Sequence, residues 1–269
     1  MFDYFDIHSH LYFPDYDADR EIEIEKMKEA KIGTILIGTG VESSQKCIEL
    51  AEKHSNIFAC VGQHPADVKV DTEFDKEIIK LVENKEVNKK VVAIGECGLD
   101  YFRMSENDID LKETQKKIFQ SHIDLAIKVE KPLMLHIRSS KGTADAYEEA
   151  LDILEKNYKK FGHKLRGNAH FFAGSPDILK RFLNLGFTVS FTGVITFTQD
   201  YDELIRQTPL DMIMSETDAP YVAPVPYRGS RNSPLYVPEV VRAIARIRGE
   251  DFEMVRKQLI TNVIRNFRI

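Results

Sequence analysis

Short apolar segments alternate with longer helical patterns along the whole chain, and this alternation constrains the fold more than any other feature of the sequence. Eight segments are short, apolar and often β-branched, and most are followed by Gly, Pro, Asp or Ser, as buried strands are. The predicted strands are Tyr4–Ile7, Thr34–Gly38, Ile57–Val61, Val91–Gly95, Leu133–His136, Gly167–Phe171, Phe187–Phe191 and Asp211–Ser215.

The segments between these strands have helical periodicity. Phe74, Ile78 and Val82 follow the spacing of one helix face. Strands that alternate with helices predict a parallel sheet with right-handed crossovers. We therefore expect an α/β protein with a single TIM-type (β/α)8 barrel. A doubly wound open sheet is the alternative, but it needs a glycine-rich phosphate loop after the first strand, where this chain has His8-Ser9-His10.

The length agrees with one barrel. The chain has 269 residues, the usual size of this fold, and no Ser/Gly-rich linker or low-complexity tract divides it. We expect one domain over residues 1–269. No apolar run is long enough to predict a membrane span, and the acidic, aromatic N-terminus does not resemble a secretory signal. These features predict a cytoplasmic protein without a membrane partner, and no obligate protein partner is evident.

The charge and the cysteines exclude other classes of protein. The formal net charge is −6, so a global basic surface for long nucleic acids is not expected, although a local cationic pocket can still hold a few phosphates. The cysteines have no CxxC spacing, and their odd number predicts buried thiols rather than disulfides: Cys47, Cys60 and Cys97.

Polar residues that can bind a metal gather where the predicted strands end. The chain has eight histidines, and five of them lie at strand ends: His8, His10, His64, His136 and His170. Glu96 and Asp218 occupy the same position on two further strands. Because the carboxyl ends of barrel strands form the active-site face, these side chains are expected to meet.

The residue types indicate a metal site. His8 and His10 are two residues apart on an extended segment and so point to the same side. Imidazole and carboxylate ligands suit zinc, manganese, iron or magnesium. Six ligands (His8, His10, Glu96, His136, His170 and Asp218) exceed what one zinc ion takes from a protein. We therefore expect two divalent ions (Mg, Zn or Mn) that share a carboxylate, roughly 3.5–4 Å apart.

The other polar residues near these positions have simpler interpretations. His122 lies on the apolar face of a long helical pattern and is expected to be packed, while His54 and His163 lie in polar stretches and are expected to be solvated. Glu216 precedes Asp218 by two residues. It is either a support for the metal ligands or a charge at a strand exit, and the sequence favours neither.

The motifs around these residues resemble those of the TatD-type metal-dependent hydrolases, within the amidohydrolase-like group of metal-bound barrels. The matching segments are Asp6-Ile7-His8-Ser9-His10-Leu11, Gly62-Gln63-His64-Pro65, Gly95-Glu96-Cys97-Gly98-Leu99-Asp100, His136-Ile137-Arg138, His170-Phe171-Phe172-Ala173-Gly174, Glu216-Thr217-Asp218-Ala219-Pro220 and the proline-rich segment 224–234. The resemblance covers essentially the whole chain. Phe171 departs from it, since relatives often have cysteine there, but this position is not a ligand.

The resemblance implies a deoxyribonuclease, often exonucleolytic, with DNA or short nucleic-acid ends as substrate. It implies one metal held by His8, His10, Glu96 and Asp218, and a second held by Glu96, His136 and His170. It also implies that His64 and Arg138 face the substrate phosphate. Glu96 and Asp218 would be the catalytic carboxylates.

Two other functions compete with this interpretation. A barrel of this class can hydrolyse a small amide, lactone or phosphoester, and a barrel can serve for binding alone. His64, Arg138, Arg228 and Arg231 favour a phosphodiester, because a neutral amide does not require so many cations. Arg228 and Arg231 follow Asp218 on a proline-rich loop. Their alternative role is to pair with surface carboxylates.

Overall fold

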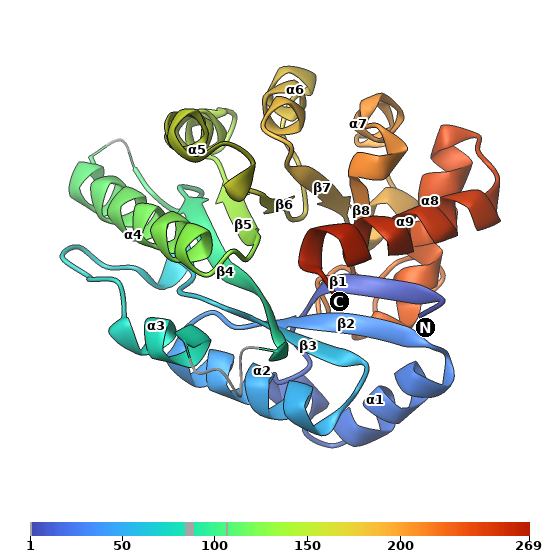
Figure 1. Cartoon of the computed structure of the whole chain (residues 1–269). Coiled ribbons are helices and arrows are strands. Elements are labelled where there is room, and N and C mark those ends of the chain that lie inside the picture. The colour runs from blue at the N-terminus through green and yellow to red at the C-terminus, as the bar shows by residue number, and fades with distance from the viewer. Residues whose placement is uncertain (1, 84–88, 106) are drawn as a thin grey trace.

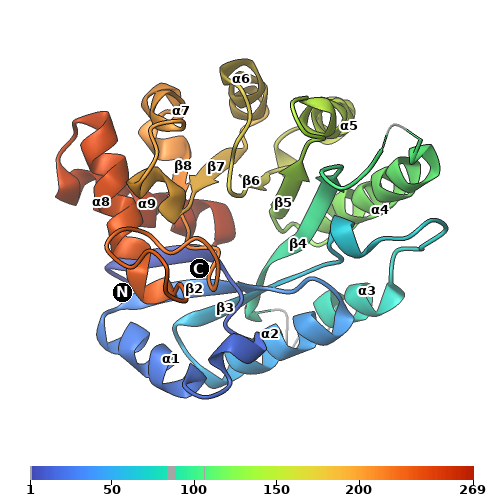
Figure 2. The same cartoon turned by 180° about the vertical axis from the view of Figure 1, so that it is seen from behind.

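Eight parallel strands form the centre of the computed structural model, which describes residues 2–83, 89–105 and 107–269. They follow one another in sequence order across a single sheet, with the helices outside it (Figures 1 and 2). The strands are β1 Tyr4–Ser9, β2 Ile32–Ile37, β3 Ile57–Val61, β4 Val91–Asp100, β5 Leu133–Arg138, β6 Gly167–Ala169, β7 Thr188–Phe191 and β8 Ile213–Ser215. All eight predicted strands are confirmed.

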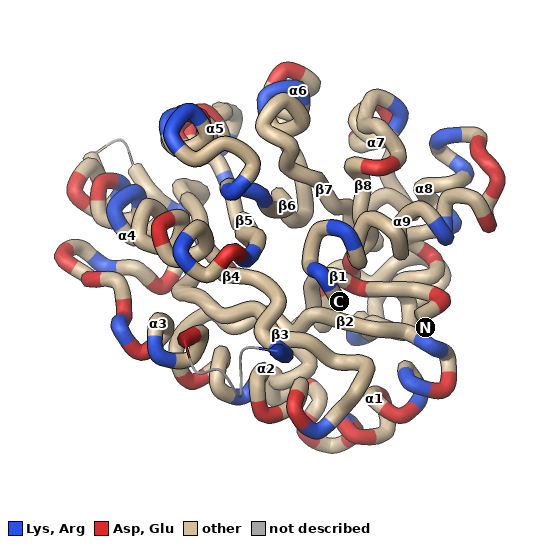
Figure 3. The backbone as a smooth tube through the Cα atoms, viewed as in Figure 1, with Lys and Arg blue, Asp and Glu red and all other residues tan. Residues whose placement is uncertain are grey.

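Helices connect the strands, as the periodicity predicts. They are α1 Arg20–Glu29, α2 Val41–Lys53, α3 Lys76–Glu83, α4 Ile109–Lys128, α5 Asp145–Phe161, α6 Pro176–Asn184, α7 Asp202–Gln207, α8 Val237–Arg248 and α9 Phe252–Phe267. Among the described residues, no helix is both long and apolar enough to cross a membrane. Lys, Arg, Asp and Glu are interspersed along the outer helices (Figure 3), which agrees with the absence of a global basic surface.

The last strand meets the first and brings the two ends of the sheet together. The Asp218 N–H donates to the His8 carbonyl at 2.9 Å, and the His10 N–H donates to the Ala219 carbonyl at 2.8 Å. The Ser215 hydroxyl also donates to the Phe5 carbonyl at 3.1 Å. The predicted (β/α)8 barrel is therefore confirmed, and the seam between β8 and β1 brings His8, His10 and Asp218 together.

A separate apolar cluster fills the end of the barrel opposite the strand carboxyl ends. Inward residues such as Phe5 and Ile35 pack there against Val263 and Phe267 of α9. Helix α9 thus closes this end, and the polar side chains gather at the other. Cys47, Cys60 and Cys97 are all buried and free, as predicted.

Three strands run further toward their carboxyl ends than the sequence suggests, and the first of them, β1, continues to Ser9. β4 continues to Asp100 and β5 to Arg138, because Cys97 to Asp100 stay paired with Leu135 to Arg138. Glu96 therefore lies within a strand rather than in the predicted loop after Gly95, and its N–H donates to the Gly38 carbonyl at 3.1 Å. His136 lies inside β5 rather than at its predicted last position. Gly95 allows this pairing: its φ is +147°, and a Cβ there would lie 2.4 Å from the Met134 carbonyl oxygen.

Candidate metal centre

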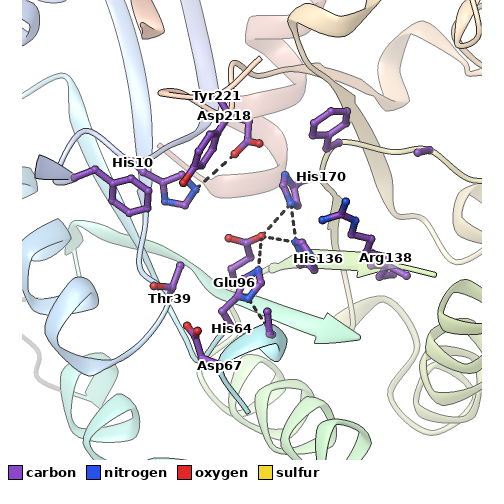
Figure 4. Close-up of a pocket in the computed structure, with 15 residues that line it drawn as sticks. His10, Thr39, His64, Asp67, Glu96, His136, Arg138, His170, Asp218 and Tyr221 are labelled. Carbon is purple, nitrogen blue, oxygen red and sulfur yellow. Dashed lines mark hydrogen bonds and ion pairs between the residues drawn. The ribbon is translucent and has the colours of Figure 1, made fainter. Parts of the chain in front are cut away.

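The six predicted ligands converge at the carboxyl ends of the strands. Five of them line a pocket of about 560 Å3: His10, Glu96, His136, His170 and Asp218 (Figure 4). His8 is fully buried and contacts Glu96 and Asp218. The side chains come from β1 and the residue after it, from β4 and β5, and from the segments after β6 and β8, so five parts of the barrel contribute to one site.

The first cluster joins β1 to the segment after β8. His8 Nε2 lies 3.5 Å from Glu96 Oε2 and 3.7 Å from Asp218 Oδ1, and His10 Nε2 lies 3.6 Å from the same Asp218 oxygen. Neighbouring ligand atoms that share an ion at 2.0–2.2 Å are separated by about 2.8–3.6 Å in octahedral or tetrahedral geometry. The three separations in this cluster are close to the upper end of that range.

The second cluster surrounds the other oxygen of Glu96. Glu96 Oε1 lies 2.9 Å from His136 Nδ1 and 3.0 Å from His170 Nε2, and these two ring nitrogens are 3.3 Å apart. Glu96 therefore directs one oxygen to each cluster, which is the arrangement of a carboxylate between two ions.

Unpaired buried atoms show that the donor set fits divalent ions. Both ring nitrogens of His8 are buried without a hydrogen bond, which is costly for a polar group in a protein interior. An ion in the first cluster would satisfy Nε2. The surrounding donors are imidazoles and carboxylates, the ligands that zinc and manganese take in such sites.

Glu216 resolves the question that the sequence left open, because it contacts two of the histidines. Its Oε2 lies 3.8 Å from His8 Nδ1 and 3.4 Å from His170 Nδ1. The two imidazoles stack, with centroids 3.8 Å apart and planes at 11°. Glu216 Oε1 accepts hydrogen bonds from the Phe171 N–H at 2.5 Å and the Ser190 hydroxyl at 3.1 Å. Both Nε2 atoms are thereby turned toward the two clusters.

Asp100 contacts His136 in the same supporting way, and this role was not predicted from the sequence. Its Oδ2 lies 3.0 Å from His136 Nε2, while Oδ1 accepts the Phe102 N–H at 3.0 Å. This contact leaves His136 Nδ1 facing Glu96. The sequence did contain a signal, because Asp100 follows Glu96 by an even number of residues on one strand and can share its face.

Asp6 was also missed, and it ties β1 to the segment after β8. It accepts hydrogen bonds from the His8 N–H at 3.0 Å, the Thr217 N–H at 2.9 Å and the Thr217 hydroxyl at 2.6 Å. Complete burial outweighs these bonds and raises the pKa of Asp6 to about 8. The contact fixes the backbone on both sides of the first cluster.

The histidines of the centre favour the ionised forms of its two ligand carboxyls. Burial opposes ionisation of Glu96, but His64, His8 and His170 hold the pKa of this carboxyl well below its usual value. Burial also opposes ionisation of Asp218, yet the hydrogen bond with His10 and the charge of His8 keep its pKa low. Both carboxyls are therefore anions that can attract cations.

Two of the predicted substrate contacts also line the pocket. The Nδ1 atom of His64 accepts the Ala66 N–H at 3.0 Å, so its Nε2 carries the proton in the neutral ring and lies 3.4 Å from Glu96 Oε1. Arg138 stacks over the Phe102 ring at 3.7 Å. Within residues 2–83, 89–105 and 107–269, no carboxylate forms an ion pair with it.

Arg228 and Arg231 lie outside the pocket lining. Arg228 stacks over the Phe197 ring at 3.8 Å. Arg231 donates two hydrogen bonds to Asp19, at 2.9 and 2.7 Å, and its guanidinium lies over Tyr16. The loop after β8 runs back against α1, so the structure gives Arg231 the alternative role, pairing with a carboxylate.

The remaining histidines lie away from the centre. His122 is fully buried; its Nε2 accepts the Gln63 N–H at 3.0 Å and its Nδ1 lies 2.9 Å from the Ile118 carbonyl. The prediction of a packed histidine is confirmed. His163 is exposed, as expected, whereas His54 is largely covered and lies 3.2 Å from Glu21.

Fold and site together define a class of protein, the metal-dependent hydrolases built on a (β/α)8 barrel. The family model described as "TatD related DNase" matches residues 5–268, and the chain belongs to this family. It is 35% identical to the "Uncharacterized metal-dependent hydrolase YabD" of Bacillus subtilis over 98% of this chain and 99% of that protein.

Two further comparisons agree with the family. The protein named "3'-5' ssDNA/RNA exonuclease TatD" of Pantoea ananatis is 29% identical, over 98% of each chain. The crystal structure of YJJV, a TatD homolog from Escherichia coli, superposes with a TM-score of 0.85 at 24% identity, over 99% of this chain and 98% of that one. This second likeness concerns the fold.

Proposed function

We propose that this hydrolase cleaves phosphodiester bonds near the ends of single-stranded or frayed DNA, with two divalent ions. His8, His10, Glu96 and Asp218 hold one ion. Glu96, His136 and His170 hold the other. The observation that carries the proposal is the position of Glu96, whose oxygens lie 3.5 Å from His8 and 2.9 Å from His136 respectively.

The bound ions would lower the pKa of water and neutralise the charge that develops on the phosphate oxygens. The chain supplies the base. Asp218 is an anion whose side chain is 15% exposed and reaches the pocket, so it can take a proton from the attacking water. Glu96 is nearly buried and serves as the shared ligand.

The phosphate contacts come from His64 and Arg138. His64 presents a ring N–H beside Glu96, and a phosphate oxygen can accept it. Arg138 offers the planar fork that matches a phosphate oxygen pair, and its stacking on Phe102 leaves the guanidinium edge for a ligand. The named activity of the Pantoea ananatis relative supports a nucleic-acid substrate for this chain as well.

The test is hydrolysis of end-labelled single-stranded DNA by the purified protein with Mg²⁺, Mn²⁺ or Zn²⁺, before and after treatment with a chelator. We expect release of short products that stops with the chelator and returns with the metal. If no ion supports nucleotide release and the protein instead hydrolyses a small amide, lactone or phosphomonoester, then the proposal is wrong and the centre acts on a small-molecule substrate.

A further inference from the structure

Two aromatic side chains, Phe13 and Tyr221, form one wall of the pocket next to the first cluster. The Phe13 ring stacks on His10, with centroids 4.8 Å apart and planes at 20°. The Tyr221 ring meets Phe13 edge to face at 6.3 Å. Figure 4 shows Tyr221 beside His10 and Asp218, and Arg138 beside His136. The aromatic wall therefore adjoins the first cluster, and the Arg138 side chain adjoins the second.

Packing of the protein does not account for Tyr221, because 53% of the residue is exposed. Its backbone is nevertheless held. The Tyr221 N–H donates to the Asp218 carbonyl at 2.8 Å, and its carbonyl accepts the Asn232 side chain at 2.5 Å. An aromatic ring on a fixed backbone presents a flat apolar face at a small cost in entropy.

The backbone of Phe13 is held in the same way. Its N–H donates to the His10 carbonyl at 2.9 Å, and its carbonyl accepts Arg20 at 3.0 Å. The backbone at each of the two aromatic residues is therefore hydrogen-bonded to a candidate metal ligand, Phe13 to His10 and Tyr221 to Asp218. A ligand on the wall lies at a defined place relative to the clusters.

We propose that Phe13 and Tyr221 are a stacking platform for one unpaired nucleobase of the substrate, next to the phosphate that is cleaved. This inference deepens the proposed function and rests on it. Every base has a π-face, so stacking binds nucleotides with little sequence preference. A base on Tyr221 has left the stack of a double helix, and the platform therefore selects single-stranded or frayed ends.

The experiment combines a change in the protein with a change in the DNA. Tyr221→Ala and Tyr221→Phe are assayed on a single-stranded oligonucleotide and on the same oligonucleotide with an abasic residue at each end in turn. We expect Tyr221→Ala to lower kcat/KM on normal DNA about 10-fold, the order that one stacked base contributes. The abasic end should cost the natural protein a similar factor and cost Tyr221→Ala little more. Tyr221→Phe keeps the ring and should stay within about twofold of the natural protein.

Tyr227→Ala is the matched control, because Tyr227 is a partly exposed tyrosine that stacks on Tyr236 at 3.8 Å outside the pocket lining. Tyr227→Ala should leave kcat/KM unchanged on both the normal and the abasic oligonucleotide. If the natural protein and Tyr221→Ala lose the same factor at an abasic end, the two changes are independent and the platform is refuted.

A substrate without a base separates this failure from failure of the proposed function. Methyl p-nitrophenyl phosphate contains the phosphodiester and no nucleobase. Turnover of this ester and of DNA, with no dependence on Tyr221, would refute the platform alone. Absence of hydrolysis of both would refute the proposed function. In that case, binding of a fluorescent oligonucleotide to the Tyr221→Ala protein, compared with binding to the natural protein, still decides whether the wall binds a base.

Discussion

Replacement of Glu216 by glutamine tests whether one buried carboxylate supports ligands of both proposed metal ions. Glu216 Oε1 accepts the Phe171 N–H and the Ser190 hydroxyl, so the amide oxygen of glutamine will take that place. The amide NH₂ then faces His8 Nδ1 and His170 Nδ1. Each of these nitrogens becomes an acceptor, and the ring proton moves to Nε2, the atom that must bind the metal.

The structure sets the size of the effect. Loss of a partner behind one metal-bound histidine weakens metal affinity about 10- to 100-fold. Glu216 lies behind one histidine of each cluster, at 3.8 and 3.4 Å. We therefore expect Glu216→Gln to weaken both metal-binding events by about 10-fold or more, which is about 1.4 kcal/mol or more for each.

The assay is competition for Zn²⁺ or Mn²⁺ against a chelating dye, or calorimetry, and it requires no turnover. Asp100→Asn is the matched control, because Asp100 contacts only His136 among the three supported histidines and its change should weaken only one binding event. Ser190→Ala keeps the charge of Glu216 and shows the effect of disturbing its position if Glu216→Gln folds poorly. Equal affinities in Glu216→Gln and the natural protein, or loss of a single event, would refute the reasoning.

Three further predictions follow from the site and the core. Asp218→Asn should abolish turnover and leave the thermal unfolding temperature of the metal-free protein near its natural value, because asparagine keeps the shape but not the basicity; a normal kcat in the metal-loaded variant would contradict this role. The affinity for DNA should fall as the salt concentration rises, and a log–log plot of the two should have a shallow slope that corresponds to roughly one to four neutralised phosphates. Arg138→Ala should reduce that slope by about one. A slope near zero, measured with an inactive variant, would argue against phosphate contacts. Burial lowers the pKa of His122 from 6.5 to about 4, so the neutral ring contributes stability that is present above pH 6.5 and is lost as the pH falls toward 4. Between pH 7 and pH 5 the natural protein should therefore lose about 2 kcal/mol more unfolding free energy than His122→Gln. Urea denaturation of both proteins at the two pH values measures this difference.

The sequence determined the order and type of the elements because their signals are local. Apolar strands with turn residues after them, and helices with one apolar face, depend on spacing along the chain. β3 begins and ends where the pattern predicts, at Ile57 and Val61. β4 does not, because its last residues are held by pairing with β5, and no local pattern records that pairing.

The sequence also indicated which side chains gather at the centre. Their position at strand ends is enough for this, since parallel strands of a barrel bring their carboxyl ends to one face. The position does not state which atoms meet. Only the tertiary structure places Glu96 Oε1 and Oε2 beside different histidines.

The supporting contacts were decided by tertiary structure alone. Glu216 touches His8, which is more than two hundred residues earlier in the chain, and Arg231 finds its partner Asp19 across a similar separation. A charged residue pairs with whatever the fold brings within reach, and sequence spacing does not encode that distance. For this reason the residue types were readable from the sequence, whereas the roles of Asp6, Asp100, Glu216 and Arg231 became clear only when the barrel closed.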